Sequence, residues 1–181
     1  AWSWYPFRFH AEGIFANGQA RTQQWEVTAT SASGSISVLP LILKHVYLSD
    51  LSAENIDYRQ RPRLKPDVDY SGRLAYFPEI KGRDVVPVES IEQKKKRPWK
   101  IHVSDATITG DHRFWVFNIQ GSATGGASGN LYTETRRGAF WLDVEQFDLE
   151  LGPTILNGVA ETFHGGHAAG SLGFSPLIRA D

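Results

Sequence analysis

Two histidines on either side of a glycine pair form the spacing in this sequence that most suggests a metal site. His164 and His167 flank Gly165-Gly166, and two imidazoles this close could share one ion. A zinc site would need a third ligand, such as Glu161 or Asp148. The helical zinc motif, in contrast, places its two histidines four residues apart on one helix face. A Gly-Gly hairpin turn with two polar flanks is the simpler interpretation, so we predict no metal ligands and no cofactor.

Carboxylates and serines are the other side chains that could carry chemistry. Glu145, Asp148 and Glu150 lie close together and could act as general acid and base, as in a glycosidase, if a cleft held them at the right separation. They also occupy the polar positions of alternating strands, which a solvated sheet face explains fully. The stretch Gly121–Gly129 has neither the strand-to-helix context of a nucleophilic serine nor that of a phosphate-binding loop. We therefore predict no catalytic residues and a protein that is not an enzyme.

The composition excludes several classes of function. The 181 residues carry 19 Lys+Arg against 20 Asp+Glu, so the chain lacks the basic surplus of a nucleic-acid-binding domain. There is no cysteine, which rules out disulfides, thiolate zinc sites and a cysteine nucleophile. No apolar run reaches the length of about 18 residues that predicts a membrane-spanning helix. A single domain is expected at this length.

The elements that would have to position any site are strands, because apolar and polar residues alternate with a period of two. Alternation is clear in Gln24–Thr30, Trp99–Ser104 and Phe140–Leu151. This is typical of strands with one dry and one wet face and favours antiparallel pairing. Phe114–Ile119 is apolar at every position but one, which predicts a strand covered on both faces or one inside a larger assembly. We expect an all-β fold, either a curved antiparallel sheet or a β-sandwich, with about 10 to 11 strands.

Glycine and proline signals divide these strands. Pro40 and the aliphatic residues after it predict one helical turn, since proline is tolerated at a first helical position. Turns between strands are predicted at six places. They are Ala16-Asn17-Gly18, Ser33-Gly34, Gly110-Asp111, Gly125-Gly126, Asn157-Gly158 and Gly165-Gly166.

Residues 61–98 differ from the rest of the chain. They hold five of the nine prolines and the basic run Lys94–Arg97, which predicts an extended excursion over the surface. We expect a single β-domain with N-terminal strands in 1–60, this Pro-rich basic excursion in 61–98, and C-terminal strands in 99–181.

Basic and aromatic residues coincide near this excursion and at the start of the chain. Such residues suit an anionic membrane surface, although a solvated loop or an aromatic core cluster would explain them as well. The residues that we predict to lie at a membrane surface are Trp2, Trp4, Tyr5, Arg61, Arg63, Lys94, Lys95, Lys96, Arg97 and Trp99.

Several runs together resemble the AsmA-like proteins of the bacterial envelope. The resemblance covers most of the chain and rests on loose hydrophobic patterns rather than on catalytic signatures. In the N-terminal half it is carried by Trp25–Ala29, Ser35–Leu41, Val46–Leu51 and Ile56–Arg59. The later residues that carry it are Arg61-Pro62-Arg63, Pro98–Ile101 and Phe114-Trp115 with the glycine-spaced strands that follow.

This resemblance implies a curved sheet with an apolar concave face and a location on the periplasmic face of a membrane in the bacterial cell envelope. It also implies an N-terminal membrane anchor outside these residues. Larger relatives form a long groove that is thought to guide lipids.

Two functions follow as the main hypotheses. In the first, a non-enzymatic membrane-associated domain shields or passes lipid chains, so its partners are membrane lipids. In the second, it is a structural subunit that docks on a membrane protein complex. A carbohydrate-binding sandwich that uses Trp115 or Trp141 is a weaker third. The residues that we predict to face lipid or a partner are Trp25, Val27, Ile101, Val103, Phe114, Val116, Phe140, Leu142 and Val144.

Overall fold

The computed structural model describes residues 7–19, 22–77, 79–82, 98–134, 140–156 and 160–174, the last range without the side chains of 160–163. These residues form one sheet of nine strands and two short helices, a 3-10 helix at Leu39–Leu43 and α1 at Ser71–Leu74. The strands are β1 (Phe7–Gln19), β2 (Gln23–Ser37), β3 (His45–Pro62), β4 (Lys100–Val116), β5 (Ile119–Glu134), β6 (Phe140–Leu151), β7 (Thr154–Leu156), β8 (Ala160–Phe163) and β9 (Gly166–Phe174). The predicted all-β class is confirmed, as an open, curved, mostly antiparallel sheet.

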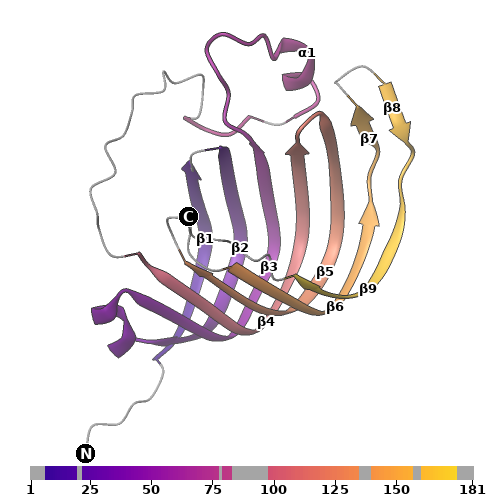
Figure 1. Ribbon diagram of the computed structural model, residues 1–181. Coiled ribbons are helices and arrows are strands. Elements are labelled where there is room, and N and C mark those ends of the chain that lie inside the picture. Colours follow the sequence, from indigo (N-terminus) through magenta and orange to yellow (C-terminus); the bar gives the residue numbers. More distant parts are fainter. Residues whose placement is uncertain are drawn as a thin grey trace, which may run out of the picture.

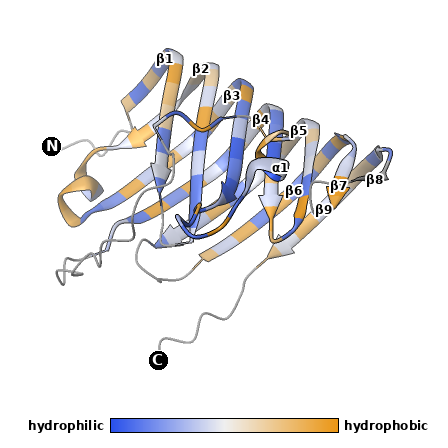
Figure 2. Cartoon of the chain, turned by 90° about the horizontal axis from the view of Figure 1, so that it is seen from above, coloured by the Kyte–Doolittle hydropathy of each residue, from blue (hydrophilic) through white to orange (hydrophobic). Residues whose placement is uncertain are grey.

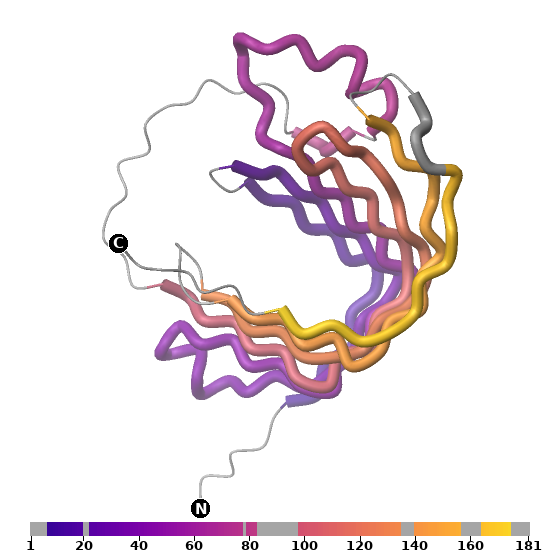
Figure 3. Tube along the Cα trace, turned by 45° about the vertical axis from the view of Figure 1, so that its right-hand side comes forward, coloured from indigo at the N-terminus to yellow at the C-terminus, as the bar shows by residue number. Residues whose placement is uncertain are grey.

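Each long strand is bent into a U, so that the sheet forms a half-pipe that is open along one side (Figures 1 and 3). We call the two limbs of the U the upper and lower arms, as oriented in Figure 1, and the space between them the groove. The strand order along the groove is β1-β2-β3-β4-β5-β6-β9, and only β3 and β4 pair in parallel. β6 supplies a lower arm and a bend, and β7 continues into the upper arm beside β5. Seven strands at a spacing of about 4.8 Å make a groove roughly 29 Å long.

Bulges produce this bend. Asp50, Asn55 and Asp105 have left-handed backbone conformations inside strands, with φ between 51° and 53°. Asn and Asp tolerate this conformation better than other residues with side chains, and a bulged strand bends and twists. The register slips in neighbouring pairs fall close to one another, so the bend continues from strand to strand. These slips lie at Ser33/Ser35, Ala53/Ile56, Val103/Ala106, Ser128/Gly129 and Val144/Phe147.

Four of the six predicted turns are wrong, because strands run through them. They are Ala16–Gly18 in β1, Ser33-Gly34 in β2, Gly110-Asp111 in β4 and Gly125-Gly126 in β5. Because the strands do not end at these four places, the structure describes nine strands instead of about 10 to 11. The helical turn after Pro40 is confirmed. The turn predicted at Gly165-Gly166 is also wrong, because the chain continues from β8 into β9 without reversing. Phe163 pairs with Thr154 and Gly166 with Leu151, so β8 and β9 continue one antiparallel ladder. Asn157-Gly158 lies outside the described residues.

Gly110 and Gly125 show why glycine stands inside these strands. They lie opposite each other in β4 and β5, with φ of 148° and 151°. A Cβ at Gly110 would lie 2.1 Å from the carbonyl oxygen of Ile56, and one at Gly125 would lie 2.1 Å from that of Asp148. The two glycines therefore permit a close approach of backbones, which a residue with a side chain would prevent.

The first part of the excursion packs on the convex face of the upper arm. Leu64, Phe77, Ile80 and Trp115 form the buried cluster there, and Trp115 is only 1% exposed. Glu26, also buried, accepts hydrogen bonds from the backbone N–H of Lys81 at 2.9 Å and from Arg59 Nη1 at 3.4 Å. This small core lies on the side of the sheet away from the groove, so the groove is left open.

The same packing corrects two predictions. Phe114–Ile119 is not one strand, because β4 ends at Val116 and Phe117 and Asn118 form a hairpin turn before β5. Both faces of this segment carry apolar side chains, because Phe114 and Trp115 point to opposite sides of β4. The excursion covers Trp115. Arg61 is only 2% exposed and its Nε donates to Gln24 Oε1 at 3.1 Å, so the prediction that it lies at a membrane surface is wrong.

Candidate functional site

The groove itself forms a cavity with a volume of about 660 Å³. This volume falls within the usual range for sites that bind small molecules, about 300 to 1,000 Å³. Its walls come from β2 to β6 and β9. The apolar side chains that line it are Val27, Ile56, Ile108, Ala123, Ala127, Leu142, Val144, Phe147, Leu149 and Leu172.

Register aligns the apolar side chains into rows that run along the groove. One row passes through every strand of the main order, and its members are Phe7, Ile36, Leu48, Val103, Leu131, Leu142 and Phe174. A second row, nearer the bend, consists of Ala11, Ala32, Ala53, Ile108, Ala127, Phe147 and Gly170. Successive side chains of a strand point to opposite faces, so the sequence neighbours of a row member lie on the convex face. Figure 2 shows the resulting change of hydropathy along each strand.

Opposite the groove, the convex face of β6 is polar. Asp143, Asp148 and Glu150 are exposed there and alternate with residues that line the groove. Glu145, at the bulge, accepts a hydrogen bond from Asn130 Nδ2 at 3.1 Å. The carboxylates considered as an acid–base set thus lie on the solvated face, away from the candidate cavity.

Eight of the nine residues predicted to face lipid or a partner lie on the concave face. Val27, Leu142 and Val144 line the cavity, and Val103 is aligned with Leu142 through Leu131. Register places the others in rows on either side of it.

Ile101 and Phe140 form a row with Thr133 nearer the lower edge of the sheet. Trp25 and Phe114 are aligned through Gln60 in the upper arm. Val116, the ninth, is 39% exposed at the end of β4.

A polar cluster interrupts the apolar wall at Tyr58, Gln60 and His112. The Tyr58 hydroxyl donates to Gln60 Oε1 at 3.1 Å, and the rings of Tyr58 and His112 lie 5.0 Å apart. His112 Nε2 is buried and has no hydrogen-bond partner among the described residues. Burial lowers the pKa of His112 and raises the pKa of Tyr58, so both side chains are neutral near pH 7.

Sequence reasoning missed this cluster and several groove residues. Ile56 and Tyr58 were part of a resembling run but not of the predicted site, and Ile108 and Leu172 stood in stretches without clear alternation. The bulges at Asn55 and Asp105 shift the alternation by one residue, which conceals it. An Asn or Asp that breaks an alternating pattern would have been the signal.

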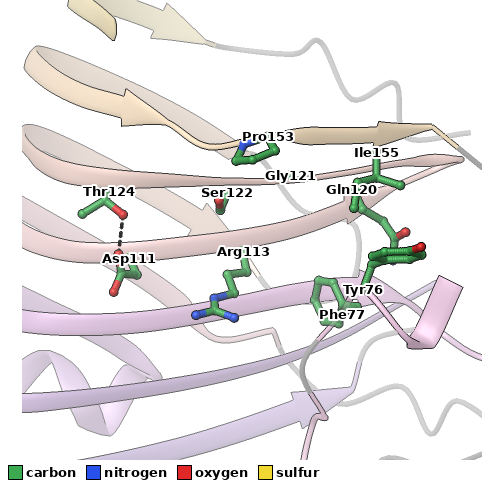
Figure 4. A pocket seen from close by; sticks show the side chains of 10 residues that line it. All are labelled: Tyr76, Phe77, Asp111, Arg113, Gln120, Gly121, Ser122, Thr124, Pro153 and Ile155. Carbon is green, nitrogen blue, oxygen red and sulfur yellow. Dashed lines mark hydrogen bonds between the residues drawn. The ribbon is translucent and has the colours of Figure 1, made fainter. Parts of the chain in front are cut away.

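A second, smaller cavity lies on the convex side, between the excursion and strands β4 and β5 (Figure 4). Asp111, Arg113, Gln120 and Thr124 line it, and Thr124 Oγ1 donates to Asp111 Oδ1 at 2.5 Å. Its volume of about 170 Å³ is below the usual range for ligand sites. The groove is therefore the better candidate.

In the histidine pair considered as a metal site, His167 contacts a carboxylate instead. His167 Nε2 lies 2.8 Å from Asp148 Oδ1, and this hydrogen bond raises the pKa of His167. Among the residues that the structure describes, no three metal-ligating side chains form a group.

The predicted membrane-surface residues fall into two sets. Trp2, Trp4, Tyr5 and Lys94–Arg97 lie outside the described residues. Trp99 is 43% exposed next to the start of β4, and Arg63 is half-buried beside the end of β3. Within the described part of the chain, no helix is long and apolar enough to cross a bilayer.

Comparisons with known proteins add no relative to this geometry. A scan against protein-family models found no match, and searches of curated proteins and of solved structures found none either. The resemblance to AsmA-like proteins therefore stays a prediction.

Proposed function

We propose that this protein is a non-enzymatic, membrane-associated β-domain of the bacterial cell envelope that shields lipid acyl chains in its groove. The observation that carries this proposal is the set of apolar rows along an open concave face. Contiguous apolar surface that is exposed to water is costly, at about 25 cal/mol per Å². Soluble proteins that keep such a surface generally use it for binding.

The dimensions of the groove suit an acyl chain. The hydrocarbon core of a bilayer is about 30 Å thick, so the chains of one leaflet reach about 15 Å. The groove is roughly 29 Å long, with strands about 4.8 Å apart. An acyl chain can therefore lie lengthwise along the apolar rows.

The open side of the half-pipe suits an amphiphile. It runs along the groove (Figure 3), so that a polar headgroup can stay in water while its chain lies against the sheet. A closed barrel or sandwich core would have to bury the headgroup as well. The open shape thus favours lipids over wholly apolar ligands.

A second candidate function, a structural subunit of a membrane protein complex, is favoured by the two edges of the sheet. Among the described strands, β1 and β9 each pair with one neighbour, and the apolar row that ends in Phe7 and Phe174 leaves these side chains 64% and 51% exposed. An unpaired strand edge can take up a strand from another chain.

Native mass spectrometry of two matched variants separates these functions. Ile108→Glu places a charge in the groove at a residue that is already 39% exposed, and Thr109→Glu places it on the opposite face of the same strand. After extraction in mild detergent, we expect bound phospholipid on the wild type and on Thr109→Glu, and its loss from Ile108→Glu. Equal lipid on both variants would overturn the groove proposal. A stable protein partner without lipid on this chain would favour the structural subunit.

A further inference from the structure

An exposed aliphatic protrusion lies at one end of the lower arm. Residues 38–43, which we call the lower tip, contain no charged residue and include the 3-10 helix between β2 and β3 (Figure 1). Ile42 and Leu43 are 81% and 62% exposed, and Val38 and Leu39 are 44% and 41% exposed. Four aliphatic side chains on one short turn are thus left exposed by the part of the chain that the structure describes.

The lower tip has a defined conformation. The backbone N–H of Lys44 donates to the carbonyl oxygen of Leu41 at 2.9 Å, and Lys44 has the left-handed conformation that ends the helix. The N–H of Lys100 then donates to the carbonyl oxygen of Lys44, also at 2.9 Å. This second bond places Trp99, itself 43% exposed, beside the tip. The tip is thus a preformed wedge, and a partner need not order it on binding.

Charged residues surround the tip in a particular arrangement. Two lysines, Lys44 and Lys100, stand at its base, and Lys100 Nζ lies 3.5 Å from Glu134 Oε1. Lysines next to an inserted apolar segment suit a membrane with anionic headgroups, because each lysine near the surface adds electrostatic attraction. Glu134 offsets part of this charge, so the aliphatic tip must provide most of the affinity.

An aromatic row lies behind the tip on the convex face of the lower arm. Register aligns Tyr47, His102, Tyr132 and Trp141 across four strands. The ring centres of Tyr47 and His102 are 4.7 Å apart, and those of Tyr132 and Trp141 are 6.1 Å apart. Tyr and Trp are enriched where membrane and water meet, because their rings are amphipathic.

We propose that the lower tip inserts into one leaflet of an anionic lipid bilayer, with the aromatic row at the level of the headgroups. A bilayer fits better than a protein partner because the surface is a protruding aliphatic wedge flanked by lysines. Protein interfaces, in contrast, have cores enriched in aromatic residues and arginine. This inference deepens the proposed function, since it names the membrane contact, but it does not require lipid in the groove.

Vesicle binding tests the site. We compare Ile42→Asp combined with Leu43→Asp against Phe117→Asp, which changes an 84% exposed residue in the β4–β5 hairpin turn at the opposite end of the U. We expect the tip variant to bind phosphatidylglycerol-containing vesicles at least about tenfold more weakly than the wild type, because two aliphatic side chains that insert into the bilayer are replaced by charged ones. Phe117→Asp should bind as the wild type does.

The absence of cysteine allows a second readout of depth. A polarity-sensitive fluorophore on Leu43→Cys should shift to the blue when vesicles are added, whereas one on Phe117→Cys should not. Unchanged binding by the tip variant, a loss of binding with Phe117→Asp, or no shift at Leu43→Cys would overturn the inference.

Failure here can be told apart from failure of the groove proposal. Ile108→Glu should still bind vesicles as the wild type does, because the groove is not the membrane contact. If the wild-type protein carries bound lipid but does not bind vesicles, the groove proposal stands and only the tip proposal is overturned.

Discussion

His112 and His167 lie on opposite faces of the sheet, and their pKa values move in opposite directions. Burial in the groove wall lowers the pKa of His112, whereas the hydrogen bond to Asp148 raises the pKa of His167. Stability from a lowered histidine pKa is present above the unfolded value of about 6.5 and is lost as the pH falls through the folded value. Stability from a raised pKa is present below about 6.5 and is lost as the pH rises through the folded value.

Two substitutions should therefore change the acid dependence of stability with opposite sign. His112→Phe removes a group that must be protonated at low pH, so Tm should fall less between about pH 8 and pH 5 than it does in the wild type. His167→Asn removes a contact that becomes stronger when His167 is protonated. Its Tm should therefore fall more than that of the wild type over the same pH range. Thermal unfolding in a series of buffers measures both. Parallel pH profiles for the wild type and both variants would contradict the assignment.

At the scale of elements, the bends of β4 and β5 depend on glycines that let neighbouring backbones approach. Gly125→Ala would bring a Cβ against the carbonyl oxygen of Asp148, at a backbone conformation that favours glycine. We expect a loss of about 2 kcal/mol or more in the free energy of unfolding.

Its neighbour provides the control. A Cβ at Gly126 would lie no closer than 3.4 Å to the carbonyl oxygen of Ile108, so Gly126→Ala should cost less than about 1 kcal/mol. Urea unfolding measures both values. If the two alanine variants lost equal stability, the close approach at Gly125 would not be what shapes the bend.

The strands show how far sequence reasoning reaches. Alternation in Gln24–Thr30 and Phe140–Leu151 predicted their faces correctly, because a sheet with one apolar and one polar face produces alternation whether the apolar face is covered or open. The number of strands was overestimated because Gly110 and Gly125 look like turn residues in sequence and permit a bend in the structure. Alternation was hidden on either side of Asn55, where one extra residue shifts the phase.

The candidate site was predictable only in part, for the same reason. Val27, Leu142 and Val144 line the cavity and follow plain alternation, whereas Ile108 and Tyr58 depend on register with neighbouring strands. Whether an apolar face is covered by a second sheet, as in a sandwich, or left open depends on the long-range path of the chain. Local patterns carry no information on that path.

At the scale of the whole molecule, the two proposed sites share one geometry. The aliphatic tip and its aromatic row lie on the lower arm, and the inner surface of that arm is the apolar row that contains Val103 and Leu142. If the lower arm rests on a bilayer, the open side of the half-pipe lies close to the membrane surface. A chain of lipid could then move from leaflet to groove over a short distance.

The central claim is that the concave face, and not the convex face, contacts lipid. Photo-cross-linking tests it directly, with a photoreactive amino acid placed at Ile108 or Leu172 on the concave face and at Thr109 or Ser171 on the convex face. These positions form pairs of sequence neighbours, and all four are exposed enough to accept the probe. We expect radiolabelled phospholipid to be attached at Ile108 and Leu172 and not at Thr109 or Ser171. Cross-links at the convex positions alone, or at none of the four, would contradict the groove as the lipid site.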